Sequence, residues 1–103
     1  MVGDMQPLDA KTLRRALRSL PGWRKRRGCL ERTFERADFM DALRLVNRVG
    51  RLAERLQHHP DIQIRWNRVT FSLTTHDAGG ITDKDLELAR RIDRLATPGS
   101  RGA

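Results

Sequence analysis

The chain has 103 residues, which fits one domain that buries roughly two-thirds of its unfolded surface. Its formal net charge is +8, from 21 Lys and Arg against 13 Asp and Glu. Because the acidic residues are interspersed and only residues 24–27 form a compact basic run, we expect a solvated basic surface and not a nucleic-acid-binding protein. The single cysteine, Cys29, excludes an intrachain disulfide and a cysteine-based zinc cluster.

The sequence predicts neither a secretory signal nor a membrane span. The first seven residues lack the basic and apolar regions of a secretory signal, and no apolar stretch approaches the ~18 residues of a membrane span. We therefore expect a cytoplasmic protein that does not contact membranes. With no repeats and no linker, we expect a single domain over residues 1–103, ordered over about 8–96, with a flexible tail at 97–103.

The first third of the chain predicts a helix followed by a hairpin. Asp9 is placed to cap a helix whose apolar residues recur at three- and four-residue steps, and Pro21-Gly22 ends it. Residues 23–34 then predict two short strands joined near Arg27-Gly28, where glycine supplies a positive φ.

A second and longer helix begins at Asp38, which suits the N-cap position. The residues expected to form its buried stripe at 3.6-residue spacing are Phe39, Ala42, Leu43, Val46, Val49, Ala53 and Leu56. Pro60 disfavours helical geometry in the residue before it, so this helix must end by His59.

Two strands and a third helix complete the chain. Apolar residues fall on even numbers over 62–66 and on odd numbers over 69–73, which predicts a two-residue turn at Asn67-Arg68. Residues 82–85 resemble a capping box and begin a helix whose expected buried face is Leu86, Ala89, Ile92 and Leu95. The order α-β-β-α-β-β-α with short connections predicts an α+β fold, a four-stranded, mainly antiparallel sheet with three helices packed on one face.

All three histidines lie at one end of this predicted sheet. His58 and His59 close the long helix, and His76 ends the strand that pairs with the strand after His59. Asp85 begins the last helix one loop later, and Glu54 lies one helical turn before His58, where it can accept from that ring. Because imidazole gives and takes protons near neutral pH, the cluster predicts a proton-transfer site.

The histidines also have two other interpretations. Adjacent histidines at a helix end interact favourably with the helix dipole, and a three-histidine site is chemically able to hold zinc. Neighbouring residues point in divergent directions, however, so His58 and His59 suit one metal ion poorly, and we expect neither a metal nor a cofactor. Cys29 lies in the other predicted hairpin, far from the histidines, so we do not expect nucleophilic catalysis.

The surroundings of the histidines form an extended motif. Its parts are Glu54-x-x-x-His58-His59-Pro60, an aromatic at Trp66, Asn67-Arg68-Val69, Leu73-Thr74-Thr75-His76-Asp77 and Gly80-Ile81-Thr82-x-x-Asp85. This motif closely resembles the pterin-4a-carbinolamine dehydratase family over about residues 8–96. The resemblance implies the dehydration of 4a-hydroxytetrahydropterin (4a-hydroxytetrahydrobiopterin in its best-known form) to quinonoid dihydropterin without a metal or prosthetic group. It also implies the family's α+β fold and a homodimer or homotetramer.

The resemblance further implies a role for each residue of the motif. His58 and His76 would be proton donor and acceptor, His59 would bind and orient the pterin, and Asp85 would orient the histidines, so that the catalytic set is His58, His59, His76 and Asp85. The expected substrate-binding residues are Glu54, Gln57, His58, His59, Pro60, Thr74, Thr75, His76 and Asp77. The alternative is a catalytically silent binding or assembly factor with the same fold, for which a degraded site would be the cue.

Overall fold

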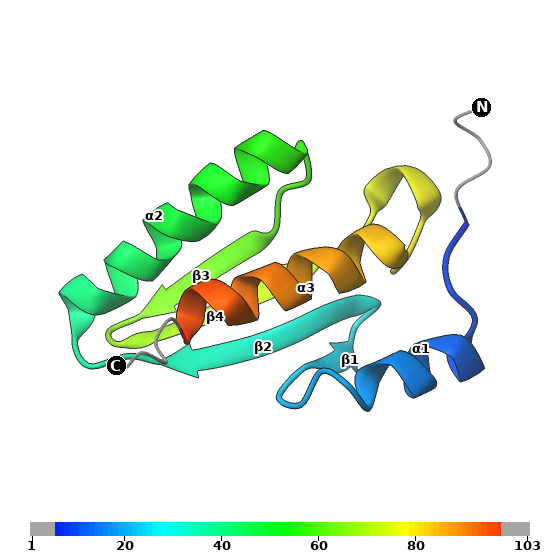
Figure 1. Cartoon of the computed structure of the whole chain (residues 1–103), viewed down its shortest axis with the longest axis horizontal. Coiled ribbons are helices and arrows are strands. Elements are labelled where there is room, and N and C mark those ends of the chain that lie inside the picture. The colour runs from blue at the N-terminus through cyan, green and yellow to red at the C-terminus, as the bar shows by residue number, and fades with distance from the viewer. Residues whose placement is uncertain (1–5, 98–103) are drawn as a thin grey trace.

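The structure is a computed structural model that describes residues 6–97. In chain order its elements are α1 (Ala10–Leu17), β1 (Arg24–Arg26), β2 (Cys29–Glu35), α2 (Phe39–Leu56), β3 (Asp61–Arg65), β4 (Arg68–Leu73), the 3-10 helix η2 (His76–Ala78) and α3 (Asp83–Ala96) (Figure 1). The predicted order is confirmed, with η2 as an addition, and the predicted tail lies outside the described residues except for Thr97. No helix of the described part is long and apolar enough to span a membrane.

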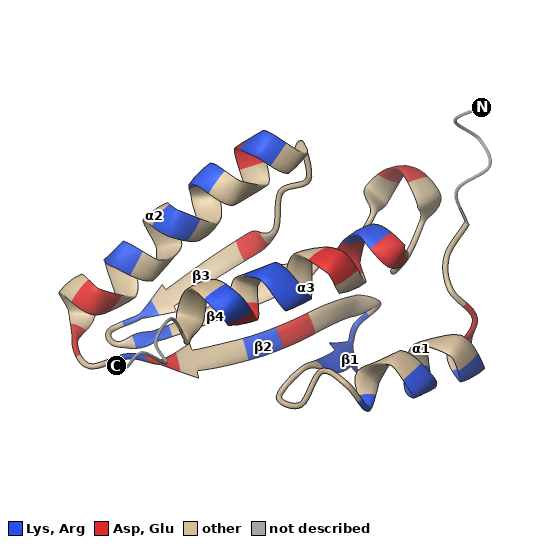
Figure 2. Cartoon of the chain, viewed as in Figure 1, with Lys and Arg blue, Asp and Glu red and all other residues tan. Residues whose placement is uncertain are grey.

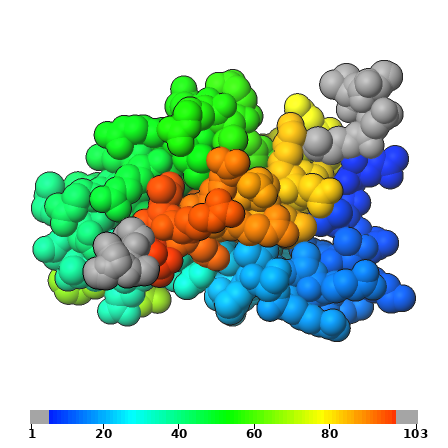
Figure 3. Space-filling model, viewed as in Figure 1, coloured from blue at the N-terminus to red at the C-terminus, as the bar shows by residue number. Residues whose placement is uncertain are grey.

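The four strands form one antiparallel sheet in the order β1-β2-β4-β3. Leu30 of β2 lies opposite Leu73 of β4, and both are buried against the helices. Thr33 and Thr70 lie opposite each other on the other face, with their hydroxyls 2.7 Å apart. The apolar positions therefore alternate toward one face, which the helices cover as predicted. Figure 3 shows α3 filling the space between α2 and the N-terminal third of the chain.

The predicted local signals at turns and helix starts are confirmed. The side chains of Asp9 and Asp38 each accept the backbone N–H three residues later at 2.8 Å, which is N-cap geometry. Arg27 and Gly28 form the first hairpin turn with φ of 53° and 79°. Short-range polar and glycine patterns thus identified these boundaries correctly.

The buried face of α2 differs in part from the predicted stripe. Ala42, Val49 and Ala53 are buried as expected, but Leu45 and Leu52 are buried as well. The two ends of the predicted stripe, the first and last residues of the helix, are 45% and 38% exposed. The direction of the face is set by packing against α3 and β4, which the 3.6-residue period does not specify.

The second hairpin turn lies one residue earlier than predicted. Arg65 pairs with Arg68, so the turn is Trp66-Asn67, and Trp66 takes the left-handed conformation with φ 53°. Asn67 is buried because its amide donates to the carbonyl of Arg36 at 2.9 Å, while the Arg36 N–H donates back to its carbonyl at 2.7 Å. Trp66 is consequently exposed at the tip of the hairpin and does not continue the apolar pattern of β3.

Gly50 offers a stabilising substitution in α2. A Cβ built at this position meets no atom within 4 Å. Because glycine costs a helix interior roughly 0.5–1 kcal/mol relative to alanine, Gly50→Ala is expected to raise the free energy of unfolding by that amount and Tm by roughly 2–8 °C. Thermal unfolding followed by circular dichroism measures this. Gly28→Ala is the control and is expected to lower Tm, since its φ is +79°. An unchanged or lower Tm for Gly50→Ala would contradict the prediction.

Asp41, in the first turn of α2, makes the free energy of unfolding depend on pH in the acid range. The backbone hydrogen bond from Ala37, with smaller contributions from Arg36 and Arg44, holds the pKa of Asp41 below its ordinary value of 3.8. A carboxyl whose pKa is depressed on folding adds stability above its unfolded pKa and loses it as the pH falls through the folded pKa. Asp41→Asn is therefore expected to unfold at lower urea concentration at pH 7, with the difference shrinking as the pH falls below about 4. If Asp41→Asn lowers the urea midpoint by the same amount at pH 7 and at a pH below about 4, the prediction is wrong.

Candidate active site

The end of α2 determines how the two adjacent histidines leave the helix. Gln57 takes a left-handed conformation with φ 54°, and the N–H of His58 donates back to the carbonyl of Ala53 at 3.1 Å. This is the pattern of a Schellman C-terminus, which ends α2 at Leu56 before Pro60 requires it. His58 and His59 therefore lie in the connection to β3 and not in the helix.

A pocket of about 240 Å³ lies between this connection and the end of β4. Its lining residues are Gln57, His58, His59, Thr74, Thr75, His76, Asp77 and Lys84. All three imidazoles thus reach one pocket, together with most of the expected substrate-binding residues. Glu54 and Pro60 line an adjoining groove instead. Lys84 was not predicted to line the pocket. The only feature of the sequence that could have indicated it is its position next to Asp85 at the start of α3.

Asp85 lies behind His58 and is completely buried. Its Oδ1 is 2.6 Å from Nε2 of His58, while its Oδ2 accepts the Thr75 hydroxyl at 2.8 Å and the Thr82 N–H at 2.9 Å. The expected approach of Asp85 to the histidines is confirmed as a direct contact. Because the carboxylate is not at the pocket surface, it acts on the pocket through His58.

The hydrogen-bond network around Asp85 fixes where the protons lie. The Thr75 hydroxyl donates to Asp85, so the Thr82 hydroxyl, 2.7 Å away, must donate to Thr75. With two other donors already directed at it, the carboxylate accepts from His58 as well, which puts a proton on Nε2 of that ring. In neutral His58 the atom left to accept a proton is therefore Nδ1.

The same carboxylate begins α3. The Thr82 side chain accepts from the Lys84 N–H at 3.2 Å and Asp85 accepts from the Thr82 N–H, which together form the predicted capping box. Among the described residues, no buried side-chain nitrogen or oxygen lacks a hydrogen-bond partner. The orientation of His58 is thus tied to the start of a helix packed in the core.

His59 has a carboxylate partner of its own. Its Nε2 lies 2.5 Å from Oε2 of Glu54, and both side chains are more than half exposed. The prediction that Glu54 serves His58 is wrong, because the reversal at Gln57 turns His59 back toward the last turn of α2. The adjacent imidazoles therefore point to different partners, and no three His, Cys, Asp or Glu side chains within residues 6–97 are grouped to hold a metal ion.

His76 is the least restrained of the three imidazoles. It is the exposed first residue of η2, and its carbonyl accepts the Gly79 N–H at 3.0 Å. No hydrogen bond from another residue of the 6–97 range reaches its ring. The backbone therefore fixes where His76 stands, while the ring remains available to a bound molecule.

A sequence profile of the family described as pterin 4 alpha carbinolamine dehydratase matches residues 6–95. The chain belongs to this family. Provisionally named pterin-4-alpha-carbinolamine dehydratases from Thermomicrobium roseum and Sulfurisphaera tokodaii are 48% and 45% identical to it over 93 residues, which is 90% of this chain and all of each relative.

Solved structures give the same result for the fold of this dehydratase-family chain. A transcriptional coactivator/pterin dehydratase from Brucella melitensis superposes with a TM-score of 0.84 at 33% identity, over 88% of this chain and 99% of that one. A pterin dehydratase-like protein identified as a RuBisCO assembly factor in the alpha-carboxysome matches with a TM-score of 0.59 at 20% identity, over 72% of this chain and 86% of that one. The second likeness shows the fold alone.

Cys29 lies closer to the site of this dehydratase-family chain than predicted. The register of β2 against β4 places it at the same end as Thr74, whose hydroxyl donates to the carbonyl of Gly28 at 3.4 Å. The expectation that Cys29 is far from the histidines is therefore wrong. Burial, followed by the negative charges of Asp61 and Asp85, raises the pKa of the Cys29 thiol, so it stays protonated and a poor nucleophile at neutral pH.

Proposed function

We propose that this chain is a hydro-lyase that dehydrates a 4a-hydroxytetrahydropterin to the quinonoid dihydropterin in the cytoplasm. The observation that carries the proposal is one pocket lined by three imidazoles, with a buried carboxylate behind one of them. The reaction removes hydroxide from C4a and a proton from a ring nitrogen, which together make water. It therefore needs one proton donor and one acceptor near neutral pH, and imidazoles serve both roles.

His58 is the proton acceptor in this proposal. Its Nε2–H donates to Asp85, which leaves Nδ1 basic and holds the ring in one orientation. A carboxylate that fixes the tautomer of a histidine and stabilises the imidazolium is the arrangement used by catalytic triads. Asp85 is accordingly a positioning residue.

His76 is the proton donor to the departing hydroxide, because its ring has no competing partner among the described residues. His59, held by Glu54, binds and orients the pterin. The hydroxyl protons of Thr75 and Thr74 are already donated, to Asp85 and to the carbonyl of Gly28, so contacts with the amide and amino edge of the pterin fall to Gln57, Asp77 and the accepting oxygen of Thr74.

The decay of enzymatically generated 4a-hydroxytetrahydropterin tests the proposal. The wild-type protein is expected to accelerate the decay over buffer, and to do so equally after treatment with EDTA, since no proposed step uses a metal. A decay no faster than in buffer would contradict the function.

The alternative is a catalytically silent binding or assembly factor with the same fold. For either function we propose that the chain forms a homodimer or a homotetramer. A degraded site would favour that role, but this chain keeps His58, His59, His76 and Asp85. Light scattering measures the oligomeric state. A protein partner that is still captured by a variant lacking both His58 and His76, together with no turnover by the wild type, would support the alternative.

A further inference from the structure

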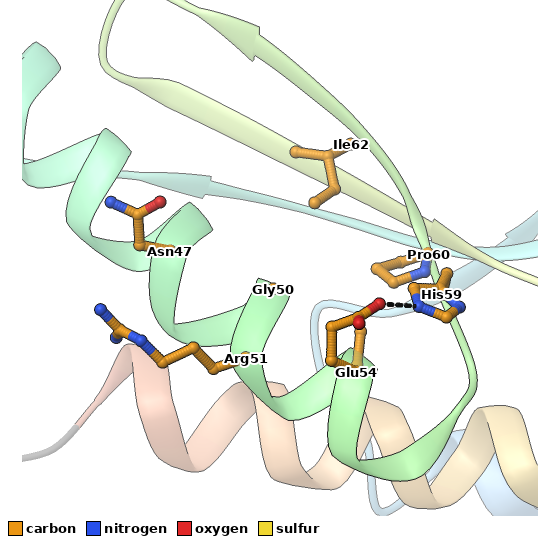
Figure 4. A pocket seen from close by; sticks show the side chains of 8 residues that line it. Asn47, Gly50, Arg51, Glu54, His59, Pro60 and Ile62 are labelled. Atoms are coloured by element: carbon orange, nitrogen blue, oxygen red, sulfur yellow. Dashed lines mark hydrogen bonds and ion pairs between the residues drawn. The ribbon is translucent and has the colours of Figure 1, made fainter.

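A second cavity, of about 460 Å³, adjoins the proposed pterin pocket. It lies between α2 and the edge strand β3, as Figure 4 shows. His59 lines both cavities, and its partner Glu54 lines this one. A molecule bound beside His59 can therefore extend past the Glu54–His59 pair into the groove.

The walls of the groove suit a flexible chain of atoms. Pro60 and Ile62 form an apolar wall on the side of β3, and Gly50 and Ala53 present almost no side chain on the side of α2. A Cβ at Gly50 would meet nothing within 4 Å, so the groove is open there. At 1.5 Å per helical residue it follows α2 for about 10 Å, the length of a substituent several bonds long.

The charge on the groove differs between its two ends. Glu54 lies at the end next to His59, whereas Arg51 and Asn47 lie at the other end (Figure 4). Arg51 forms no ion pair with any residue of the 6–97 range. It is one of four basic residues spaced along α2, a helix whose basic positions Figure 2 colours blue: Arg44, Arg48, Arg51 and Arg55. An anionic group is therefore repelled near His59 and attracted at the far end.

We propose that this groove holds the substituent at C6 of the pterin and that Arg51 makes the site selective for a substituent ending in an anion. A guanidinium binds the oxygens of carboxylate and phosphate through paired N–H donors, and Asn47 adds an amide donor. The inference rests on the proposed dehydratase function, since it names the substrate class of the same site. Pterins with a short uncharged substituent would leave Arg51 without a partner.

The dissociation constants of 7,8-dihydropterins that differ only at C6 test this inference. The C6 groups are methyl, uncharged dihydroxypropyl, a chain ending in carboxylate and a chain ending in phosphate. The wild type is expected to bind at least one anionic compound roughly tenfold more tightly than the dihydroxypropyl compound, which is the size of one charge-assisted hydrogen bond. A preference for only one of the two anions identifies the physiological group.

Matched variants separate the role of Arg51 from the general charge of α2. The quantity compared is the dissociation constant of the dihydroxypropyl compound divided by that of the preferred anionic compound. Arg51→Gln is expected to bring this ratio close to one. Arg48→Gln removes the same charge from the same helix at a position that does not line the groove, and it is expected to keep the ratio. A wild type without preference, or a preference that survives in Arg51→Gln, would overturn the proposal.

A steric pair tests the groove itself. Gly50→Met fills the open wall and is expected to weaken binding of the long-chain compounds about tenfold relative to the methyl compound, while Gly50→Ala is expected to change the ratio little. If Gly50→Met changes the oligomeric state in light scattering and leaves the ratio unchanged, the groove is an interface between copies and the proposal is wrong. Turnover of the 6-methyl substrate by the wild type decides the dehydratase function separately, because that substrate does not reach Arg51.

Discussion

Replacing His58 and His76 together by alanine is expected to reduce dehydration of 4a-hydroxytetrahydropterin to the rate in buffer. A positioned proton donor or acceptor contributes about 10²–10⁴-fold to a rate. His58→Ala and His76→Ala are each expected to lose an amount in this range. The double variant is expected to lose less than the product of the two, because donor and acceptor act on the same elimination.

The measurement is kcat and KM for each variant, with thermal unfolding as the check on folding. His59→Gln is the comparison, since our account gives His59 a binding role, and it is expected to raise KM much more than it lowers kcat. A double variant that folds like the wild type and retains its rate would show that these imidazoles do not transfer the protons.

Asp85→Asn has the second largest expected effect. The carboxylate accepts three hydrogen bonds, but an asparagine amide has one accepting oxygen and brings its own N–H donors. If the oxygen keeps its contacts with Thr75 and Thr82, the NH₂ group faces Nε2 of His58. That ring must then accept at Nε2 and carry its proton on Nδ1, where the proposed mechanism needs a base. We expect kcat to fall about 10²-fold or more, and the free energy of unfolding to fall by about 1–3 kcal/mol.

The ring ¹⁵N shifts of His58 separate the catalytic consequence from the loss of stability. We expect the proton of His58 to be on Nε2 in the wild type and on Nδ1 in Asp85→Asn. Asp83→Asn is the matched control, an exposed aspartate in the same first turn of α3, and is expected to change neither the tautomer nor kcat. A wild-type tautomer in Asp85→Asn, at unchanged kcat, would contradict the positioning role.

The fold was predictable because its signals are local. The N-caps at Asp9 and Asp38, the Arg27-Gly28 turn and the capping box at residues 82–85 each depend on residues three or fewer positions apart. The wrong predictions concern residues whose state depends on distant partners. Asn67 was expected to be the first residue of the hairpin turn, but its amide binds the carbonyl of Arg36, and Trp66 is the first turn residue instead.

The site was predictable as a set of residues and not as a set of contacts. Strand pairing placed His58, His59 and His76 at one end of the sheet before any side-chain position was known. The helical spacing that assigned Glu54 to His58 ceases to apply at Gln57, where the helix ends, and Glu54 binds His59. The groove with Arg51 could not be predicted, because it is formed by α2 and β3 together. That residues 1–103 form one domain stays a prediction, since the structure describes residues 6–97.

Our central claim is that the pterin reacts in the pocket that the three imidazoles share. The most direct test is a titration of protein labelled with ¹⁵N at histidine and tryptophan with a 7,8-dihydropterin, followed through the ring signals of His58, His59 and His76 and the indole signal of Trp66. We predict that all three imidazole signals move with one common dissociation constant while the Trp66 signal, at the opposite end of β3 and β4, stays in place. Unchanged imidazole signals at saturating pterin, or a response confined to Trp66, would contradict the claim.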